Sequence, residues 1–264
     1  MVRCRGCGHV YASPKLADIY ANYTDVADEN YLQNEPLRTA TAREVLKTIR
    51  RHQPEGRLID VGCSTGDFLV AAREYYDVEG LELSDWASEI ARDKGLTVHS
   101  KLLADFIGEQ RRYNVATFWG VIEHLEEPLI EMRRVHQILE PGGIVCIWTG
   151  DVDSIHARVL GANWWYVMGQ HIHLFSRKSL NQVMRHAGFE LIEESVYPYV
   201  MSYGYLGERL LRYPVIGPLA KLILGSRLFS GKTFNLKLFC EIFSVYRKID
   251  AARILNISSS VPVK

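Results

Sequence analysis

The sequence predicts an α/β fold in which a doubly wound, mostly parallel sheet is covered by helices on both faces. Apolar runs of strand length alternate with segments of helical periodicity along most of the chain. A glycine turn, "DVGCSTG", joins the first buried strand to the helix after it. A chain of 264 residues with 47% apolar and 23% charged residues is typical of a globular protein. We therefore expect one large domain with appendages.

Seven segments are candidate strands. In chain order they read "RLIDV", "VEGLEL", "LTVHS", "NVATFW", "IVCIWT", "FELIEESVY" and "CEIFSVY". Helices are expected over residues 37–52, 67–76 and 85–94, from Pro128, and over 176–187. Pro128 suits a first helical turn, where a missing N–H costs nothing. Ser176 can cap the start of its helix, and Gly188 can end it.

Four parts follow from this order. Residues 1–34 hold a cysteine pair and an aromatic lead-in, 35–200 form the core, 201–237 form a helical lid insertion, and 238–264 hold the final strand and a tail. The apolar stretch 205–230 is broken by Pro214 and Pro218, which predicts short helices over a pocket. It also carries Arg209, Arg212, Lys221 and Arg227, so contact with a membrane surface or a lipid-like substrate is the less ordinary alternative to a lid.

The charge balance and the cysteine content indicate which partners and which cellular compartment to expect. Lys plus Arg and Asp plus Glu both total 31, so no overall charge draws the chain to nucleic acid. The start "MVRCRGCGHVY" lacks the apolar region of a secretory signal, and no run of about 18 apolar residues suggests a membrane span. Five scattered cysteines suit a reducing compartment. We therefore expect a cytoplasmic protein with a small-molecule partner, and the oligomeric state stays open.

The spacing of the glycines and the charge of the turn exclude some classes of ligand. In the dinucleotide pattern G-x-G-x-x-G, the three glycine positions are occupied here by Gly62, Ser64 and Asp67. Asp67, in the first helical turn, would compete with a pyrophosphate for the same N–H groups. Gly62 and Gly66 are one residue too close for an ATP-type phosphate loop, and no lysine follows. The turn disfavours pyrophosphate, and a tight turn without a ligand is the alternative.

The pattern Asp60, Gly62, Ser64, Gly66 resembles the first motif of the class I S-adenosylmethionine-dependent methyltransferases, although most members have Gly where this chain has Ser64. The resemblance implies a Rossmann-like sheet of seven strands with the last strand antiparallel, and S-adenosyl-L-methionine as cofactor. It also implies that a Gly66→Val side chain would fill the space of the methionine moiety. The cofactor residues expected from it are Asp60, Gly62, Ser64, Gly66, Asp67, Phe68, Glu82, Leu83 and Trp119.

Glu82 ends the second candidate strand. A carboxylate at this place can accept both ribose hydroxyls of an adenosine, and a solvated carboxylate at a strand edge is the alternative. If Glu82 binds ribose, residues 83–86 (Leu83, Ser84, Asp85 and Trp86) would form the wall beside the ribose and adenine.

The block "YNVATFWGVIEHLEEP" resembles the later part of the same methyltransferase core, with Asn114 where members commonly have Asp. The segment after it is similar to small-molecule methyltransferases that include ubiquinone-type O-methyltransferases and sugar methyltransferases. The resemblance spans about residues 31–197 and does not specify a substrate. The quinone branch holds a divalent metal with an extra acidic residue near the Glu123–His124 pair. Gly120 stands at that position here, so no metal is expected.

The resemblance predicts a methyltransferase acting on a small molecule. A sugar or sugar-nucleotide acceptor is preferred, and a quinone or other aromatic acceptor is the near alternative. A nicotinamide oxidoreductase, opposed by Asp67, and a non-catalytic scaffold are the competitors from other classes. A sulfonium is already an activated leaving group, so alignment and exclusion of water are the main tasks. The candidate bases are His124, which could instead cap a helix, and His171 with His173, which could instead hydrogen-bond the lid. The spacing of His171 and His173 places both on one side of an extended segment.

The N-terminal "CRGCGHVY" is half of a zinc ribbon and needs two further ligands. No second C-x-x-C exists, although similar sugar methyltransferases carry an earlier pair. Cys4 and Cys7 are therefore either zinc ligands or a ribbon remnant, and His9 is either a third ligand or a surface residue. In the lead-in, Tyr20, Tyr23 and Tyr31 either line the acceptor pocket or pack on the sheet edge.

Overall fold

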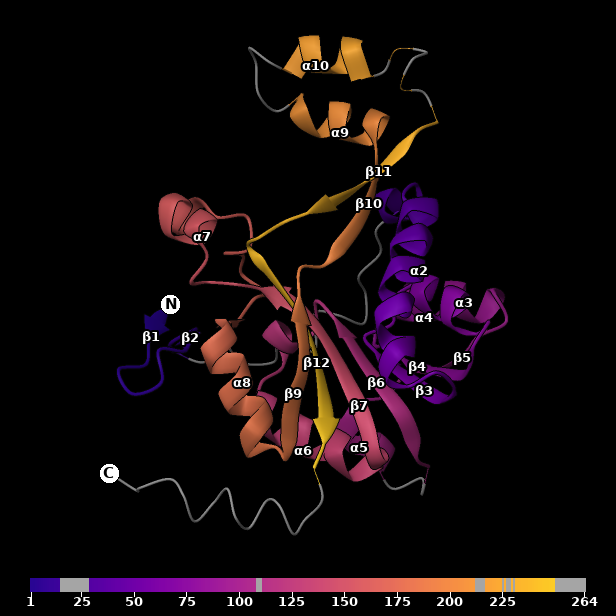
Figure 1. Cartoon of the computed structure of the whole chain (residues 1–264), viewed down its shortest axis with the longest axis vertical. Helices are drawn as coiled ribbons and strands as arrows, with labels where there is room; N and C mark the ends of the chain where they lie inside the picture. The colour runs from indigo at the N-terminus through magenta and orange to yellow at the C-terminus, as the bar shows by residue number, and fades with distance from the viewer. Residues whose placement is uncertain are drawn as a thin grey trace.

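The central sheet has seven strands in the order β5–β4–β3–β6–β7–β12–β9 in this computed structural model (Figure 1). The structure describes residues 1–14, 29–107, 111–211, 217–224, 226, 229 and 231–249. Strand β12 is antiparallel to both neighbours, and the remaining pairs are parallel. The seven predicted strands and the antiparallel last strand are confirmed. Their bounds are β3 Gly56–Val61, β4 Tyr76–Leu81, β5 Thr97–His99, β6 Tyr113–Trp119, β7 Leu139–Gly150, β9 Phe189–Ser195 and β12 Glu241–Lys248.

Helices cover both faces of this sheet, as predicted. Helices α2 (Glu35–His52), α3 (Asp67–Ala72) and α4 (Asp85–Asp93) pack on one face. Helices α5 (Leu103–Phe106), α6 (Pro128–Ile138) and α8 (Arg177–His186) pack on the other. Because successive strand residues point to opposite faces, Leu58 joins the first core cluster and Ile59 joins the second. Ser176 caps α8 through a capping box, as its sequence suggests.

The strand order creates a crevice at one edge of the sheet. The chain runs outward from β3 through β4 to β5 and then returns to place β6 on the other side of β3. Loops leaving β3 and β6 therefore diverge, and open α/β sheets bind ligands at such a switch point. The glycine turn follows β3, Glu82 follows β4, and the Glu123–His124 pair follows β6. The fold thus brings three separate motifs to one edge.

A small second sheet joins the N-terminus to the segment after β7. It consists of β1 (Val2–Arg3), β2 (Val10–Tyr11) and β8 (His173–Leu174), all antiparallel. Two further short helices are α1 (Glu29–Leu32), which precedes α2, and α7 (Ile155–Leu160), which lies to one side of the central sheet (Figure 1). Strands of two residues are too short to show alternation, so the sequence did not predict them.

The described residues between 198 and 237 form an arm that projects from the core (Figure 1). Strand β10 (Pro198–Ser202) pairs antiparallel with β11 (Thr233–Lys237), and between them lie α9 (Tyr203–Leu210) and α10 (Gly217–Leu224). The short helices expected within 205–230 are confirmed, whereas the two strands were not predicted. The base of the arm contacts α2, where the Val200 N–H donates to Thr41 Oγ1 at 2.9 Å. Within the described ranges, no helix is both long and apolar enough to cross a membrane.

Candidate functional site

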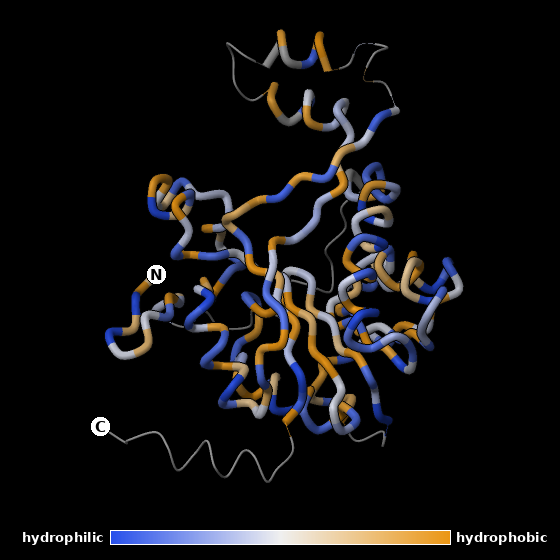
Figure 2. Tube along the Cα trace, viewed as in Figure 1, coloured by the Kyte–Doolittle hydropathy of each residue, from blue (hydrophilic) through white to orange (hydrophobic). Residues whose placement is uncertain are grey.

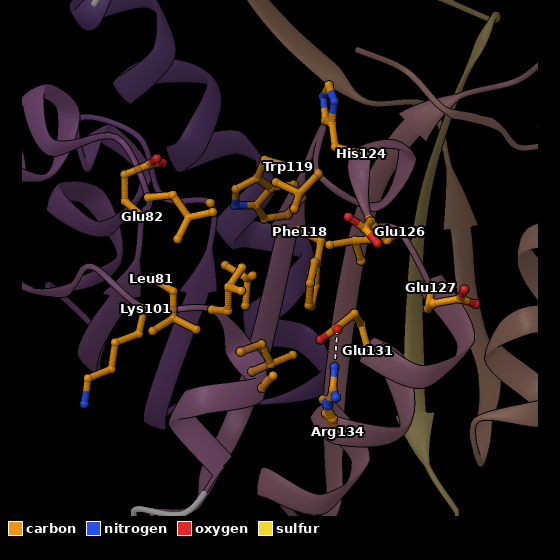
Figure 3. A pocket seen from close by; sticks show the side chains of 18 of the residues that line it. Leu81, Glu82, Lys101, Phe118, Trp119, His124, Glu126, Glu127, Glu131 and Arg134 are labelled. Carbon is orange, nitrogen blue, oxygen red and sulfur yellow. Dashed lines mark hydrogen bonds and ion pairs between the residues drawn. The ribbon is translucent and has the colours of Figure 1, made fainter. Parts of the chain in front are cut away.

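A cavity of about 520 Å³ opens at the switch-point crevice (Figure 3). Its walls come from the turn after β3, the ends of β4 and β6, the chain after β5 and the start of α6. Five of the expected cofactor residues line it, namely Gly62, Ser64, Glu82, Leu83 and Trp119. The other lining residues are Val61, Leu81, 101–104, Phe118, Gly120, Val121, 124–127, Ile130, Glu131 and Arg134. The cavity is predominantly apolar and includes several carboxylates, and none of the described residues of the arm lines it.

The glycine turn presents backbone to this cavity. Gly62 has φ +71°, and a Cβ there would lie 2.6 Å from Val121 Cγ2. Ser64 also has a positive φ, 49°, which is uncommon for a residue with a side chain. The main chain of Ser64 donates its N–H to Glu82 Oε2 at 2.8 Å. The turn after β3 and the end of β4 are therefore fixed to each other.

Gly66 lies behind the turn and not in the cavity. Its φ is +78°, and a Cβ would meet Leu96 Cδ1 at 2.3 Å and Ala91 Cβ at 3.1 Å. The expectation that a Gly66→Val side chain fills the methionine space is therefore wrong. That side chain would press into the core beneath α4 and destabilise the fold instead.

Glu82 is held in one orientation at the cavity wall. Its Oε2 accepts the Ser64 N–H, and its Oε1 accepts the Ser84 N–H at 2.8 Å. Each carboxylate oxygen has a second lone pair with which to accept a ligand hydroxyl. Leu83 lines the cavity as expected, but Ser84 caps α4, and neither Asp85 nor Trp86 is among the lining residues. The expected wall is correct only at Leu83.

Asp60 is buried at the end of β3 and accepts a hydrogen bond from Thr117 Oγ1 at 2.6 Å. Burial raises the pKa of this carboxyl to about 8, the Thr117 bond opposes the rise, and the charge of Glu82 adds to it. Asp60 does not line the cavity. It lies beneath the glycine turn.

The raised pKa of Asp60 predicts a pH-dependent stability. Between its ordinary pKa of 3.8 and about 8, the folded state keeps a proton that the unfolded state releases. The free energy of unfolding should therefore fall as pH rises through this window, and Asp60→Asn, which is neutral throughout, should reduce the slope. Urea unfolding of both proteins without cofactor, at about pH 5 and about pH 8, measures how the free energy of unfolding changes with pH. An identical slope in the two proteins would contradict the assignment.

Asp67 is neutralised by two cations. Its carboxylate accepts from Arg38 Nε at 2.6 Å and from Lys94 Nζ at 2.7 Å. Arg38 Nη1 donates to the Tyr31 carbonyl oxygen, and the guanidinium stacks on the Tyr31 ring at 3.5 Å. Arg38 Nη2 is buried and has no hydrogen-bond partner among the residues that the structure describes. Asp67 thus positions Arg38, which the sequence did not single out because it belongs to no motif.

Trp119 covers one side of the cavity. Phe68 packs behind it with ring centroids 5.0 Å apart, so Phe68 supports the wall without lining it. The indole Nε1 of Trp119 is buried and lacks a partner within the described part of the chain. In Figure 3, Trp119 is drawn between Glu82 and His124.

His124 lines the cavity at the end of a 3₁₀ turn, Ile122–His124. Its Nδ1 lies 2.9 Å from the Gln170 carbonyl oxygen, and His171 Nδ1 lies 2.7 Å from the Tyr166 carbonyl oxygen. A carbonyl only accepts, so both Nδ1 atoms carry hydrogen and the lone pair of each neutral ring lies on Nε2. The rings meet edge to face with centroids 4.6 Å apart. Burial, then the charge of His124, lowers the pKa of His171 to about 4.

Glu123 ties this pair of histidines together. It is buried, with a pKa raised by burial, and it accepts hydrogen bonds from Tyr166 and from Thr149 Oγ1 at 3.0 Å. Its carbonyl accepts the Ile172 N–H at 3.0 Å, which brings the His171 segment to the turn after β6. Donor atoms of Glu123, His124 and His171 lie within 4.8 Å of one another, the one such metal-compatible group found in the described ranges.

His173 lies apart from His124 and His171. Its Nδ1 is 2.9 Å from His9 Nε2, in the small sheet. His171 directly precedes β8, and its N–H donates to the Met168 carbonyl at 3.1 Å. The two side chains therefore have different partners, and only His171 lies beside His124.

Cys4 and Cys7 form a tight turn between β1 and β2. The Gly8 N–H donates to the Cys4 carbonyl at 3.0 Å, and hydrogen bonds from Cys7 and Gly6 lower the pKa of the Cys4 thiol. No third Cys, His or carboxylate donor joins them among the residues described. His9 is half-buried against His173 and Phe175, so it is neither a third ligand nor an exposed surface residue. Tyr20 and Tyr23 lie outside the described residues, and Tyr31 packs on Arg38 without lining the cavity.

Comparison with known proteins supplies the context of this site. A family model described as a methyltransferase domain matches residues 33–194. A ubiquinone biosynthesis O-methyltransferase of Cereibacter sphaeroides is 26% identical over 151 residues, which cover 52% of this chain and 61% of that protein. This chain therefore aligns with about three fifths of the length of that relative.

Solved structures share the fold at low sequence identity. A methyltransferase from Thermotoga maritima, described as a possible histamine N-methyltransferase, superposes with a TM-score of 0.55 at 20% identity over 84% of this chain and 94% of its own. The N-methyltransferase NodS from Bradyrhizobium japonicum, in complex with S-adenosyl-L-homocysteine, superposes with a TM-score of 0.55 at 10% identity over 88% and 97%.

Proposed function

The chain belongs to the methyltransferase-domain family, with S-adenosylmethionine as its cofactor, and we propose that it methylates a hydroxyl group of a small-molecule acceptor. The observation that carries this proposal is that His124 and Glu82 line the same cavity. A carboxylate that would bind the ribose and a histidine that would act as base are thus within one cavity. Bound S-adenosylmethionine supplies an activated methyl group.

The residues of the cavity fit this cofactor. Glu82, fixed by two N–H groups, would accept the ribose hydroxyls, and Gly62 and Ser64 would let the ligand approach the main chain. Arg38 is not a lining residue, but Asp67 holds it next to the glycine turn, and its Nη2, buried without a partner in the described chain, would donate to the carboxylate of the methionine moiety. Trp119 would cover the ligand and exclude water.

His124 would remove the acceptor proton. Its orientation is set by the Gln170 carbonyl, so Nε2 is the atom that takes the proton. Glu123 anchors the turn that carries His124 through its bonds to Thr149 and Tyr166. His171 packs edge to face against His124 and holds the ring in place. Because the methyl donor is already activated, alignment of the acceptor and one proton transfer are the tasks left to the protein.

Two acceptor classes are supported by different observations. O-methylation of a quinone-type aromatic is supported by the curated relative, whose name gives ubiquinone biosynthesis. A sugar or sugar nucleotide is supported by the Cys4–Cys7 turn, which resembles the half ribbon of sugar methyltransferases. Incubation with the cofactor and either a catechol series or a nucleoside-diphosphate sugar series, read by mass spectrometry, separates them. A mass gain in neither series would contradict a hydroxyl acceptor of these classes.

Arg38 offers a test of the proposed cofactor orientation. Arg38→Lys should weaken S-adenosylhomocysteine binding by about tenfold, because a lysine cannot keep the contact to Asp67 and also reach the carboxylate. The affinity for methylthioadenosine, which lacks that carboxylate, should change little. Calorimetry with both ligands measures the difference. Equal losses for the two ligands would show that Arg38 only supports the fold.

A further inference from the structure

Positive charge is concentrated in the arm. Across the arm, residues 198–237, the sequence has six Lys or Arg residues and one acidic residue, Glu208, although the whole chain is neutral. The remainder of the chain therefore has a net charge of −5. A cationic appendage on an anionic body is oriented by any anionic surface, because the surface attracts one part and repels the other. The six cations are Arg209, Arg212, Lys221, Arg227, Lys232 and Lys237.

Helix α10 exposes an aliphatic face at the far end of this arm. Leu219, Leu222 and Ile223 are 60%, 73% and 49% exposed, and their i, i+3, i+4 spacing places them on one face. Figure 2 shows apolar residues along α10, beyond α9 and away from the central sheet. Lys221 is also exposed on this helix. Exposed aliphatic residues beside lysine, without acidic residues, are typical of helices that lie in a membrane interface.

We propose that α10 docks this enzyme on an anionic lipid surface. The aliphatic face of α10 enters the interface between headgroups and acyl chains, and Lys221, Lys232 and Lys237, which are exposed among the described residues of the arm, contact the anionic headgroups. The body of the enzyme is anionic and is kept off the surface. Since the described residues of the arm do not line the cavity, docking leaves the cofactor site open. The proposal does not depend on which acceptor is methylated.

Flotation of the full chain with vesicles tests the proposal. Vesicles of phosphatidylcholine with a roughly equal amount of phosphatidylglycerol should bind the protein, and phosphatidylcholine alone should bind it about tenfold or more weakly. Binding should fall as salt is raised. Leu222→Glu and Lys221→Glu should each lower binding to the anionic vesicles by about tenfold. Circular dichroism and cofactor affinity should be unchanged, because both side chains are exposed and remote from the cavity.

A matched control lies on α7, where Ile155 is 79% exposed. Ile155→Glu should bind anionic vesicles like the parent. Equal binding to both vesicle types, no binding to either, or equal loss in Ile155→Glu and Leu222→Glu would each overturn the proposal. Sedimentation velocity without lipid tests the alternative that the α10 face binds a second copy of this chain. A parent dimer that Leu222→Glu converts to a monomer would show that the face binds a second copy of this chain, which would also overturn lipid docking.

Discussion

Replacing His124 with alanine should lower the turnover of methyl transfer by about 10²–10⁴-fold and leave the affinity for S-adenosylmethionine nearly intact. The imidazole lines the cavity with its Nδ1 bonded to the Gln170 carbonyl, so its removal deletes the proposed proton acceptor and no proposed cofactor contact. Steady-state rates with the identified acceptor, together with calorimetric affinities for the cofactor, measure the two effects separately.

Control variants sharpen this test. His156→Ala, an exposed histidine on α7, should turn over like the parent. His171 has a pKa lowered to about 4. If His171 were the base, kcat/KM of the parent would rise as pH increases through about 4, and His171→Asn would lose that inflection. A chelator should leave the parent rate unchanged, because the proposed role of His124 needs no metal. Near-parent rates in His124→Ala would show that catalysis depends on alignment alone.

Replacing Glu82 with alanine should weaken cofactor binding by about 1.5–3 kcal/mol, the scale of hydrogen bonds to a charged group. Both oxygens of Glu82 are fixed by main-chain N–H groups of Ser64 and Ser84, so the carboxylate is already in place to accept the ribose hydroxyls. Calorimetry with S-adenosylhomocysteine measures the loss. Glu89→Ala, an exposed carboxylate on the helix that follows, should have no effect. A loss below about 0.3 kcal/mol would show that Glu82 is only a surface carboxylate.

The core of the fold could be predicted because its signals are local. Each strand of the central sheet is an apolar run between turn residues, and the caps at Pro128 and Ser176 act within a few residues of sequence. The strands of the arm and of the small sheet were not predicted, because their signals are not local. Strands β10 and β11 pair across 30 intervening residues, and β8 has only two residues, so neither leaves a periodic pattern.

The site was predictable where a motif carries the residue and unpredictable where only the tertiary structure does. Glu82 directly follows β4 and Trp119 ends β6, both at the switch point, and both line the cavity. Arg38 reaches the turn from α2, held by Asp67, and nothing in the sequence near it shows this. Gly66 needs its positive φ, but its missing Cβ makes room for Leu96 and Ala91 and not for a ligand. A motif gives the conformation that a residue needs without showing what its side chain would meet.

Transfer of a labelled methyl group tests the proposed function most directly. The parent, Glu82→Ala and His124→Ala proteins are incubated with methyl-labelled S-adenosylmethionine and a cell extract that has been filtered to remove macromolecules. We expect label in a small-molecule product with the parent, a strong loss with His124→Ala at saturating cofactor, and recovery of Glu82→Ala as the cofactor concentration is raised. Tight cofactor binding with no labelled small molecule, or label that appears only when protein or nucleic acid is restored to the extract, would contradict the proposal.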